Sequence, residues 1–257
     1  MSVYDGMAAQ FDRRRALPAG VPETIRDTVL RAGLPPQPRL LDLGAGSGRI
    51  GRPFVLAGDD YTGVDLSFGM LRTFSDRQPG ARLVQADGAS LPFAAATFDA
   101  ALLVQVLSGV PGWRHLLAET MRVLRPGGAL LAGRVVAPDD GVDALMKTQL
   151  AVILDAMDIH PYRDKPRDDA LSWLGRQMPD PVVLTAAAWT AERTPRAFLE
   201  RHGNGARFSV LPEPVKRDAL RQLGDWAEET FGSLDAACPE DFRFELIIHR
   251  LQQGIET

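Results

Sequence analysis

The chain has 257 residues, a formal net charge of −4 at pH 7 and a sequence pI of about 5.6. Its content of 45% hydrophobic and 24% charged residues is typical of a folded domain and excludes a disordered chain. The acidic balance disfavours a nucleic-acid substrate, because it provides no positive field to attract a phosphate backbone.

Cys238 is the single cysteine, so neither a disulfide framework nor a thiolate metal cluster can form. The histidines form no ligand pair at i, i+4 helical spacing, and we therefore expect no metal site. The sequence has no run of about eighteen apolar residues and no signal-peptide core. We expect a cytoplasmic protein that is not inserted in a membrane.

In the first half of the chain, apolar runs bounded by turn residues alternate with helical patterns. Strands that are apolar on both faces and alternate with helices imply a parallel, doubly wound α/β sheet. Ser67 is a plausible N-cap for the second helix. In chain order, the expected elements are strand 39–43, helix 48–58, strand 61–66, helix 67–77, strand 81–87, strand 98–107, helix 112–124 and strand 128–136.

The alternation breaks after Val136. Residues 139–180 have helical periodicity and contain no strand, so we expect a helical insertion after the fifth strand that covers the substrate crevice. Residues 1–36 would form an N-terminal lid and the first helix, and residues 37–138 with 181–257 would form the α/β core. The core is completed by strand 181–194, helix 213–232 and strand 242–251, which brings the expected number of strands to seven.

The segment Leu40–Ile50, LLDLGAGSGRI, contains two overlapping glycine patterns. Read from Gly44, it is G-x-G-x-G, which suits a loop against which the amino-acid tail of a nucleoside lies. Read from Gly46 to Gly51, it is G-x-G-x-x-G, which suits a dinucleotide pyrophosphate. A phosphate-binding pattern should begin where the strand ends, at about Leu43. This position favours the first pattern.

Acidic residues lie at the ends of three expected strands. Asp42 would place a carboxylate close to the glycine loop, where it repels a pyrophosphate and favours a ligand with an ammonium group. Asp65 would bind ribose hydroxyls with either class of ligand. Asp87 can accept from an adenine amino group while the N–H of Gly88 donates to the ring. This distribution of acids suits a cationic nucleoside better than a dianion.

Four segments within residues 36–136 resemble the class I S-adenosylmethionine-dependent methyltransferases, of the methyltransferase type 11 branch that includes quinone-biosynthesis C-methyltransferases. The segments are LLDLGAGSGRI, YTGVDLSFGML, LVQADGASLPFAAATFDAALLVQVL and VLRPGGALLAGRVV. The resemblance implies a seven-stranded, mostly parallel Rossmann-like sheet, S-adenosyl-L-methionine as cofactor and a small-molecule methyl acceptor.

The resemblance also implies roles for particular residues. Asp42 would reach the ammonium group of the cofactor through a hydrogen-bond network, and the backbone carbonyl of Gln105 would face the same group. Phe11 would close over the cofactor from an N-terminal lid, where the family more often has tyrosine. The remaining contacts surround the methionine moiety, the ribose and the adenine. The full expected set is Phe11, Asp42, Gly44, Ala45, Gly46, Asp65, Leu66, Met70, Asp87, Gly88 and Gln105.

Methyl transfer from a sulfonium is an in-line displacement with an activated leaving group, so no catalytic triad is required. A base is needed only where the acceptor must lose a proton before attack, and the weak candidates are His160, Tyr162 and His202. Quinone-directed family members often have a histidine in the fourth strand segment, which here reads LLVQVLSGV without one, and this absence weakens the case for a quinone acceptor. The helical insertion and the absence of a basic patch favour a small, partly apolar acceptor.

Two other functions remain open from the sequence. A noncatalytic protein that binds S-adenosylmethionine would keep every cofactor residue but lack an acceptor pocket. A nicotinamide-dependent oxidoreductase would use Gly46–Gly51, but would leave Asp87, Gly88 and the LRPGG segment without a role.

Overall fold

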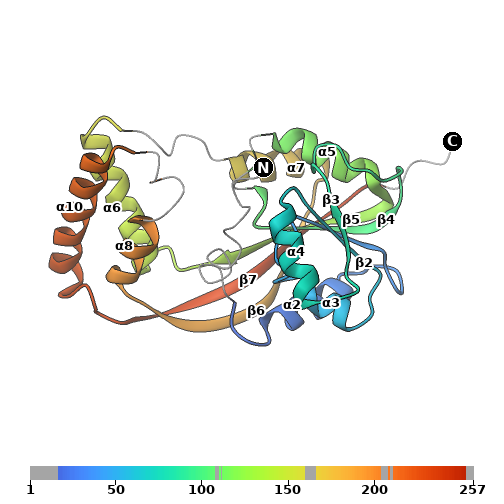
Figure 1. The fold of residues 1–257 in the computed structure, drawn as a ribbon, viewed down its shortest axis with the longest axis horizontal. Coiled ribbons are helices and arrows are strands. Elements are labelled where there is room, and N and C mark those ends of the chain that lie inside the picture. The colour runs from blue at the N-terminus through green and yellow to red at the C-terminus, as the bar shows by residue number, and fades with distance from the viewer. Residues whose placement is uncertain are drawn as a thin grey trace. The chain divides into compact units, whose positions relative to one another are not determined.

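The computed structural model describes residues 17–107, 110, 112–159, 166–203, 208 and 211–252. Within these residues, seven strands form one sheet in the order β3-β2-β1-β4-β5-β7-β6 (Figure 1). The strands are β1 (Leu40–Leu43), β2 (Tyr61–Asp65), β3 (Arg82–Gln85), β4 (Phe98–Val104), β5 (Leu124–Val136), β6 (Val182–Arg193) and β7 (Cys238–Arg250).

The pairings of β1 with β2 and β4, of β2 with β3 and of β4 with β5 are parallel. The predicted doubly wound, mostly parallel sheet is therefore confirmed. Strand order reverses between β1 and β4, and ligands of such sheets bind beyond the carboxyl ends of the strands at this reversal. The end of β1 and the loop that follows it are thus placed where a ligand site is expected.

The bounds of several elements differ from the predictions. The helix predicted at 48–58 is only α3 (Arg52–Leu56). It cannot begin at Gly48, which has φ +85°, a left-handed conformation that a right-handed helix does not contain. The strand predicted at 98–107 ends at Val104, because Gln105 has φ +58° and leaves the extended conformation. Strand β5 begins at Leu124, four residues before the predicted start.

The chain divides into two compact units. The first unit comprises Met1–Arg134, Lys165–Ala187 and Phe244–Thr257, and the second comprises Val135–Asp164 and Ala188–Arg243. Residues 139–180 contain α6 (Val142–Ala156), which belongs to the second unit, and α7 (Pro166–Gln177), which belongs to the first. The division into lid, core and insertion stays a prediction.

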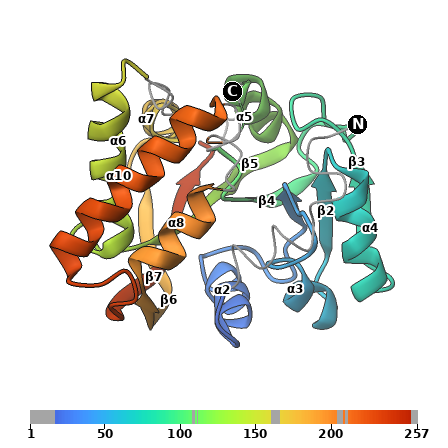
Figure 2. The ribbon, with the colours of Figure 1, turned by 60° about the vertical axis from the view of Figure 1, so that its left-hand side comes forward.

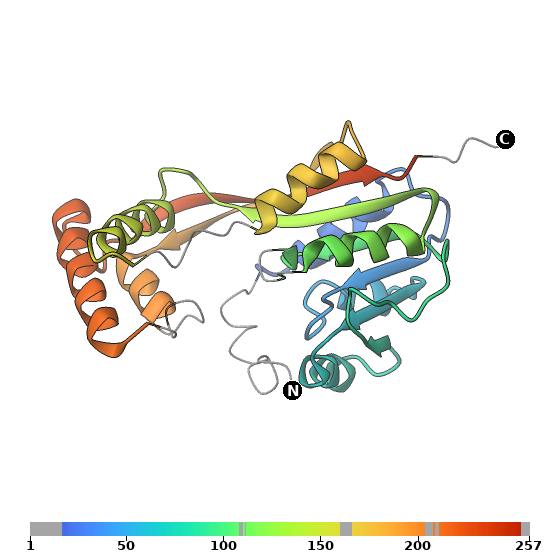
Figure 3. The ribbon, with the colours of Figure 1, turned by 90° about the horizontal axis from the view of Figure 1, so that it is seen from above.

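The core of the first unit contains side chains from the parallel strands and from two helices. Helices α5 (Trp113–Val123) and α7, green and gold in Figure 3, contribute Leu117 and Leu174, each fully buried. They pack with Leu41 and Leu43, which alternate along β1 with Leu40 and Asp42. Asp42 therefore points away from this core, towards the opposite face of the sheet.

The second unit has a hydrophobic core of its own. Helices α6, α8 (Pro195–Gly203) and α10 (Glu213–Phe231) contact one another, as Figure 2 shows. Met146, Phe198 and Leu223 are fully buried between them. Helix α10 agrees with its prediction and ends at Gly232, which has φ +78°, the left-handed conformation in which helices commonly stop.

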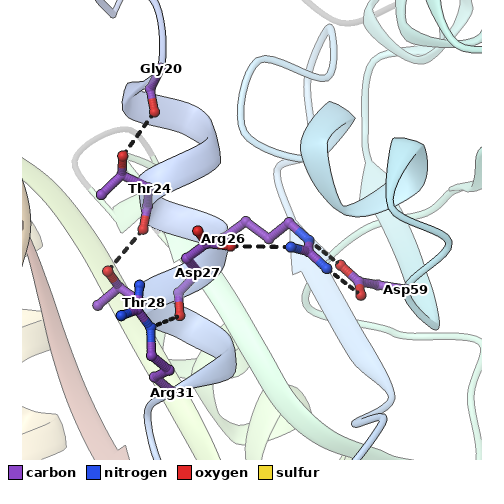
Figure 4. A network of polar contacts seen from close by, with 7 residues as sticks. All are labelled: Gly20, Thr24, Arg26, Asp27, Thr28, Arg31 and Asp59. Atoms are coloured by element: carbon purple, nitrogen blue, oxygen red, sulfur yellow. Dashed lines mark hydrogen bonds and ion pairs between the residues drawn. The ribbon is translucent and has the colours of Figure 1, made fainter.

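A bidentate ion pair joins α2 (Val21–Leu30), the first of the described helices, to the turn after α3. Arg26 donates from Nε and Nη2 to the two carboxylate oxygens of Asp59, at 2.6 and 2.9 Å (Figure 4). The two side chains are only 22% and 16% exposed. A planar guanidinium matches a carboxylate in this geometry, whereas an ammonium does not.

We predict that Arg26→Lys lowers the free energy of unfolding by about 1 kcal/mol, because one of the two charge-assisted hydrogen bonds is lost in a partly exposed setting. Urea unfolding followed by circular dichroism measures the change. The matched control is Arg31→Lys, since the side chain of Arg31 is exposed and, within the described part of the chain, donates only to the backbone oxygen of Asp27. Equal stability of the two variants would contradict the prediction.

Candidate functional site

The glycine loop after β1 is closed on one side and open on the other. A Cβ atom on Gly48 would lie 2.3 Å from the ring of Phe74, so this position cannot hold a side chain. Among the described residues, a Cβ on Gly46 would meet only the backbone oxygen of Gly44, at 3.8 Å. The loop thus packs against the protein at Gly48 and leaves free space at Gly46, where a ligand can approach the backbone.

The backbone N–H groups of Gly44, Ala45, Gly46 and Gly48 in this loop already have acceptors within the protein. A pyrophosphate is bound by such N–H groups, but the N–H of Gly46, the first residue of the dinucleotide pattern, is taken by Asp65, whose carboxylate would repel a phosphate. The loop is therefore unsuited to the dinucleotide pattern from Gly46 to Gly51. The hydrogen bonds are Gly44 and Ala45 to the oxygen of Val64 at 2.8 and 3.0 Å, Gly46 to Oδ2 of Asp65 at 2.9 Å, and Gly48 to the oxygen of Ala45 at 3.1 Å.

Asp65, at the end of β2, is brought directly to the glycine loop. Its Oδ2 accepts from the N–H of Gly46, and its Oδ1 accepts from the N–H of Ser67 at 2.8 Å. Ser67 in turn accepts from the N–H of Met70 and caps α4 (Phe68–Arg77), as predicted. A carboxylate has about four acceptor sites, so each fixed oxygen can still accept from a hydroxyl group.

Asp42 is a buried carboxylate on the β1 side of the same loop. It is 2% exposed, and Tyr61 donates from Oη to its Oδ2 at 2.7 Å. Burial raises the pKa of Asp42 to about 6, against the lowering effect of the Tyr61 hydrogen bond; the charge of Asp65 raises it further and that of Arg49 lowers it. Asp42 and Asp65 thus form one electrostatic group at the loop.

Sequence analysis missed Tyr61 and Arg49. Arg49 donates from Nη2 to the side-chain oxygen of Gln105 at 3.1 Å, and so connects the glycine loop to the end of β4. Gln105 has a positive φ although it is not glycine. Such backbone strain is concentrated at functional sites. The strained backbone of Gln105 therefore agrees with its predicted place in the cofactor site.

In the described part of the chain, the segment after β3, which contains Asp87 and Gly88, has fewer contacts with the glycine loop than the ends of β1 and β2 have. Asp87 is exposed, and its Oδ1 accepts from the N–H of Ala89 at 2.9 Å, which makes a local turn. The N–H of Ala86 donates to the backbone oxygen of Asp65 at 3.2 Å, which holds the start of this segment beside β2. Gly88 lies close to Leu116, whose Cδ1 would be 3.0 Å from an added Cβ.

The side chains after β2 differ in their access to a ligand. Leu66 is 59% exposed, as a residue in contact with adenine could be before its ligand binds. Phe68, which sequence analysis did not select, is equally exposed. Met70 is only 3% exposed and belongs to the buried face of α4, so it offers little surface to a ligand.

The remaining candidates lie elsewhere. Phe11, His160 and Tyr162 are outside the described residues. His202 lies on α8 in the second unit, where its ring stacks on Phe198 with centroids 3.8 Å apart and its Nδ1 is 3.2 Å from the oxygen of Phe198. Burial lowers the pKa of His202. A neutral imidazole is a possible base, and His202 stays a candidate.

No three His, Cys, Asp or Glu side chains among the described residues lie close enough to hold a metal ion together. None of the helices in the described part of the chain combines the length and apolar character needed to cross a membrane.

Comparison with known proteins identifies the family. A family model described as a methyltransferase domain matches residues 41–132. The demethylmenaquinone methyltransferase of Renibacterium salmoninarum is 34% identical over 196 residues, which are 74% of this chain and 81% of that protein. Seven further demethylmenaquinone methyltransferases match over 40–59% of their own length, so the chain spans about half of these relatives.

Solved structures share the fold at low sequence identity. A protein assigned as a type II methyltransferase from Anaeromyxobacter dehalogenans superposes with a TM-score of 0.60 at 20% identity, over 90% of this chain and 97% of that one. The [4+2]-cyclase SpnF superposes with a TM-score of 0.51 at 20% identity, over 91% of this chain and 81% of that one. These likenesses concern the fold alone. The sequence relatives, together with the loop geometry and the strand order, show that the chain belongs to the class I S-adenosylmethionine-dependent methyltransferases.

Proposed function

We propose that the chain transfers a methyl group from S-adenosylmethionine to a small, apolar acceptor of the quinone type. The observation that carries the proposal is the pair of carboxylates, Asp42 and Asp65, at a glycine loop in which four backbone N–H groups already have acceptors. Such a site attracts a cation and disfavours a phosphate. A nucleoside with an ammonium group and a sulfonium fits this chemistry.

The residues present fit the parts of this cofactor. Asp42 would attract the ammonium group, Asp65 would accept from the ribose hydroxyls, and the open side of Gly46 would receive the methionine chain. The exposed Leu66 and Phe68 supply an apolar surface for adenine. The set Phe11, Ala45, Met70, Asp87, Gly88 and Gln105 stays a prediction. When bound, S-adenosylmethionine supplies a methyl group activated for displacement.

The contribution of the protein to the reaction is mainly alignment. Holding the acceptor, the methyl carbon and the sulfur in line can supply roughly 7 to 11 kcal/mol of barrier lowering. Exclusion of water is also important, because water stabilises the concentrated positive charge of the ground state more than the dispersed charge of the transition state. His160, Tyr162 and His202 remain the candidate bases for an acceptor that must lose a proton.

The acceptor class is proposed from the relatives, which are named for demethylmenaquinone. The missing histidine in the fourth strand segment means that this chain would activate a quinone-type ring with other residues. One of the solved structures with this fold is a [4+2]-cyclase, so the fold alone does not establish methyl transfer and the reaction needs a direct test.

The direct test is turnover with methyl-labelled S-adenosylmethionine and demethylmenaquinone. We expect S-adenosylhomocysteine and labelled, methylated quinone in equal amounts. Binding of the cofactor without methyl transfer to any of a panel of quinones and phenols would favour a noncatalytic protein. Preference for a nicotinamide dinucleotide over S-adenosylmethionine in equilibrium binding would overturn the proposal.

We predict that Asp65→Ala weakens binding of S-adenosylhomocysteine by about 1.5 to 3 kcal/mol, the usual range for hydrogen bonds to a charged group. Isothermal titration calorimetry measures the effect. The control is Asp76→Ala, because Asp76 is 71% exposed on α4 and pairs only weakly with Arg72. Thermal unfolding is measured in parallel, since Asp65 also holds backbone N–H groups. Unchanged affinity would remove Asp65 from the site.

We predict that Asp42→Asn stabilises the free protein while weakening cofactor binding at least about tenfold, as loss of a charged partner would do. The pKa of the Asp42 carboxyl is about 6 in the folded protein, compared with the ordinary value of 3.8 expected in the unfolded chain. Ionisation of Asp42 therefore lowers the free energy of unfolding. The loss is small below about pH 4, grows between about pH 4 and pH 6, and reaches its full size above about pH 6.

Chemical unfolding at pH 7.5 should show a gain of about 1 to 3 kcal/mol for Asp42→Asn, and the gain should shrink at pH 4.5. A variant that is less stable than its parent by the same amount at both pH values would contradict this interpretation.

A further inference from the structure

We infer that Tyr61 is a positioning residue for cofactor binding, whose hydroxyl group holds the carboxylate of Asp42 in place beneath the glycine loop. The inference rests on the proposed function, because it concerns the residue that would attract the ammonium group of the cofactor. Tyr61 itself has no role in bond making or breaking.

The strand register explains how Tyr61 reaches Asp42. In the parallel pairing of β1 with β2, Leu40 lies opposite Tyr61 and Asp42 lies opposite Gly63. Residues two apart share one face of a strand, so the tyrosine ring extends over Gly63 towards Asp42. A Cβ atom on Gly63 would lie 3.2 Å from the tyrosine oxygen, tighter than an ordinary contact.

A second glycine makes room for the hydroxyl group from the loop side. A Cβ atom on Gly51 would lie 2.0 Å from the oxygen of Tyr61, a distance that no side chain can adopt. Gly51 is the residue that completes the G-x-G-x-x-G pattern. Its role here is to admit the tyrosine hydroxyl, which accounts for the second glycine pattern without a pyrophosphate.

The ring itself is held by two aromatic neighbours. Phe54 stacks on it with centroids 5.8 Å apart, and Phe74 meets it edge-on at 6.2 Å. Tyr61 is 2% exposed. Phenylalanine would fill this cluster equally well, and a buried hydroxyl is costly unless it has a partner. Packing of the ring does not require the hydroxyl group. Its hydrogen bond to Asp42 is therefore the reason for a tyrosine at this position.

The charged and titratable groups that act on Asp42 come from two elements. Tyr61 and Asp65 belong to β2, and Arg49 belongs to the glycine loop. Among the described residues, Tyr61 is the only group that donates a hydrogen bond to Asp42. Burial raises the pKa of Tyr61 well above its ordinary range, so it remains a protonated donor. Its bond favours the ionised form of Asp42, which is the form that attracts a cation.

The test is the pH dependence of S-adenosylhomocysteine binding to the full chain and to Tyr61→Phe, measured by calorimetry between pH 5 and pH 8. In the parent protein, affinity should fall as the pH drops through about 6. In Tyr61→Phe, the midpoint should move up by about one pH unit, so that the Kd at pH 6.5 rises about threefold and the difference vanishes by pH 8. A purely structural role would weaken binding by the same factor at every pH.

Two controls separate the hydroxyl from the packing. Phe54→Leu disturbs the same aromatic cluster without touching Asp42, and its midpoint should equal that of the parent. In an Asp42→Asn background, Tyr61→Phe should have no further effect on binding. An additional loss of affinity in that background would overturn the inference, because Tyr61 would then act independently of Asp42.

A second test strengthens the hydrogen bond from Tyr61 instead of removing it, and so does not depend on whether Tyr61→Phe folds. The chain has three tyrosines, so Tyr4→Phe with Tyr162→Phe leaves Tyr61 alone. Replacing it by 3-fluorotyrosine in that background gives a stronger donor of nearly the same size, which should lower the midpoint. An unchanged midpoint in both Tyr61→Phe and the fluorinated protein would overturn the inference. Failure of the parent to bind S-adenosylhomocysteine at any pH would overturn the proposed function instead.

Discussion

The site depends on one costly feature, a carboxylate buried at the end of the first strand. Asp42 is almost completely inaccessible, and its hydrogen-bond partner is a phenol rather than a cation. A structural ion pair would be more stable with a guanidinium beside it, as Asp59 has in Arg26. Retention of a buried acid whose pKa is raised by burial is typical of sites that use the charge to attract a ligand, at the expense of stability.

The surrounding elements are arranged to hold that acid and the glycine loop together. Phe74 packs against Gly48 on one side and against the ring of Tyr61 on the other, so one aromatic cluster supports both the loop and the partner of Asp42. Asp65 fixes the outer part of the loop through Gly46. At the end of β4, the side chain of Gln105 accepts from Arg49 of the loop. The site is therefore built largely from backbone geometry, with few exposed charged side chains.

Much of this arrangement could be predicted from the sequence. Strand β1, the glycine loop and the acids at the strand ends are local patterns, and the seven strands follow from apolar runs between turn residues. The late start of α3 could not be predicted, because the helical periodicity of residues 48–58 begins at Gly48, whose left-handed conformation is visible only in three dimensions. Tyr61 was missed because its role depends on the register that places Asp42 opposite Gly63. The spacing of Met70 fits an adenine contact, whereas its side chain faces the buried side of α4, which the sequence alone did not reveal; its role stays a prediction.

We propose that an adenosyl ligand lies along the open side of Gly46 between Asp42 and Asp65. A crystal structure of the chain with S-adenosylhomocysteine would test this placement. We expect the ribose hydroxyls within hydrogen-bonding distance of Asp65 and the ammonium group on the Asp42 side of the loop. A nucleoside bound elsewhere, or a pyrophosphate held by the backbone of Gly46–Gly51 in a dinucleotide complex, would contradict it.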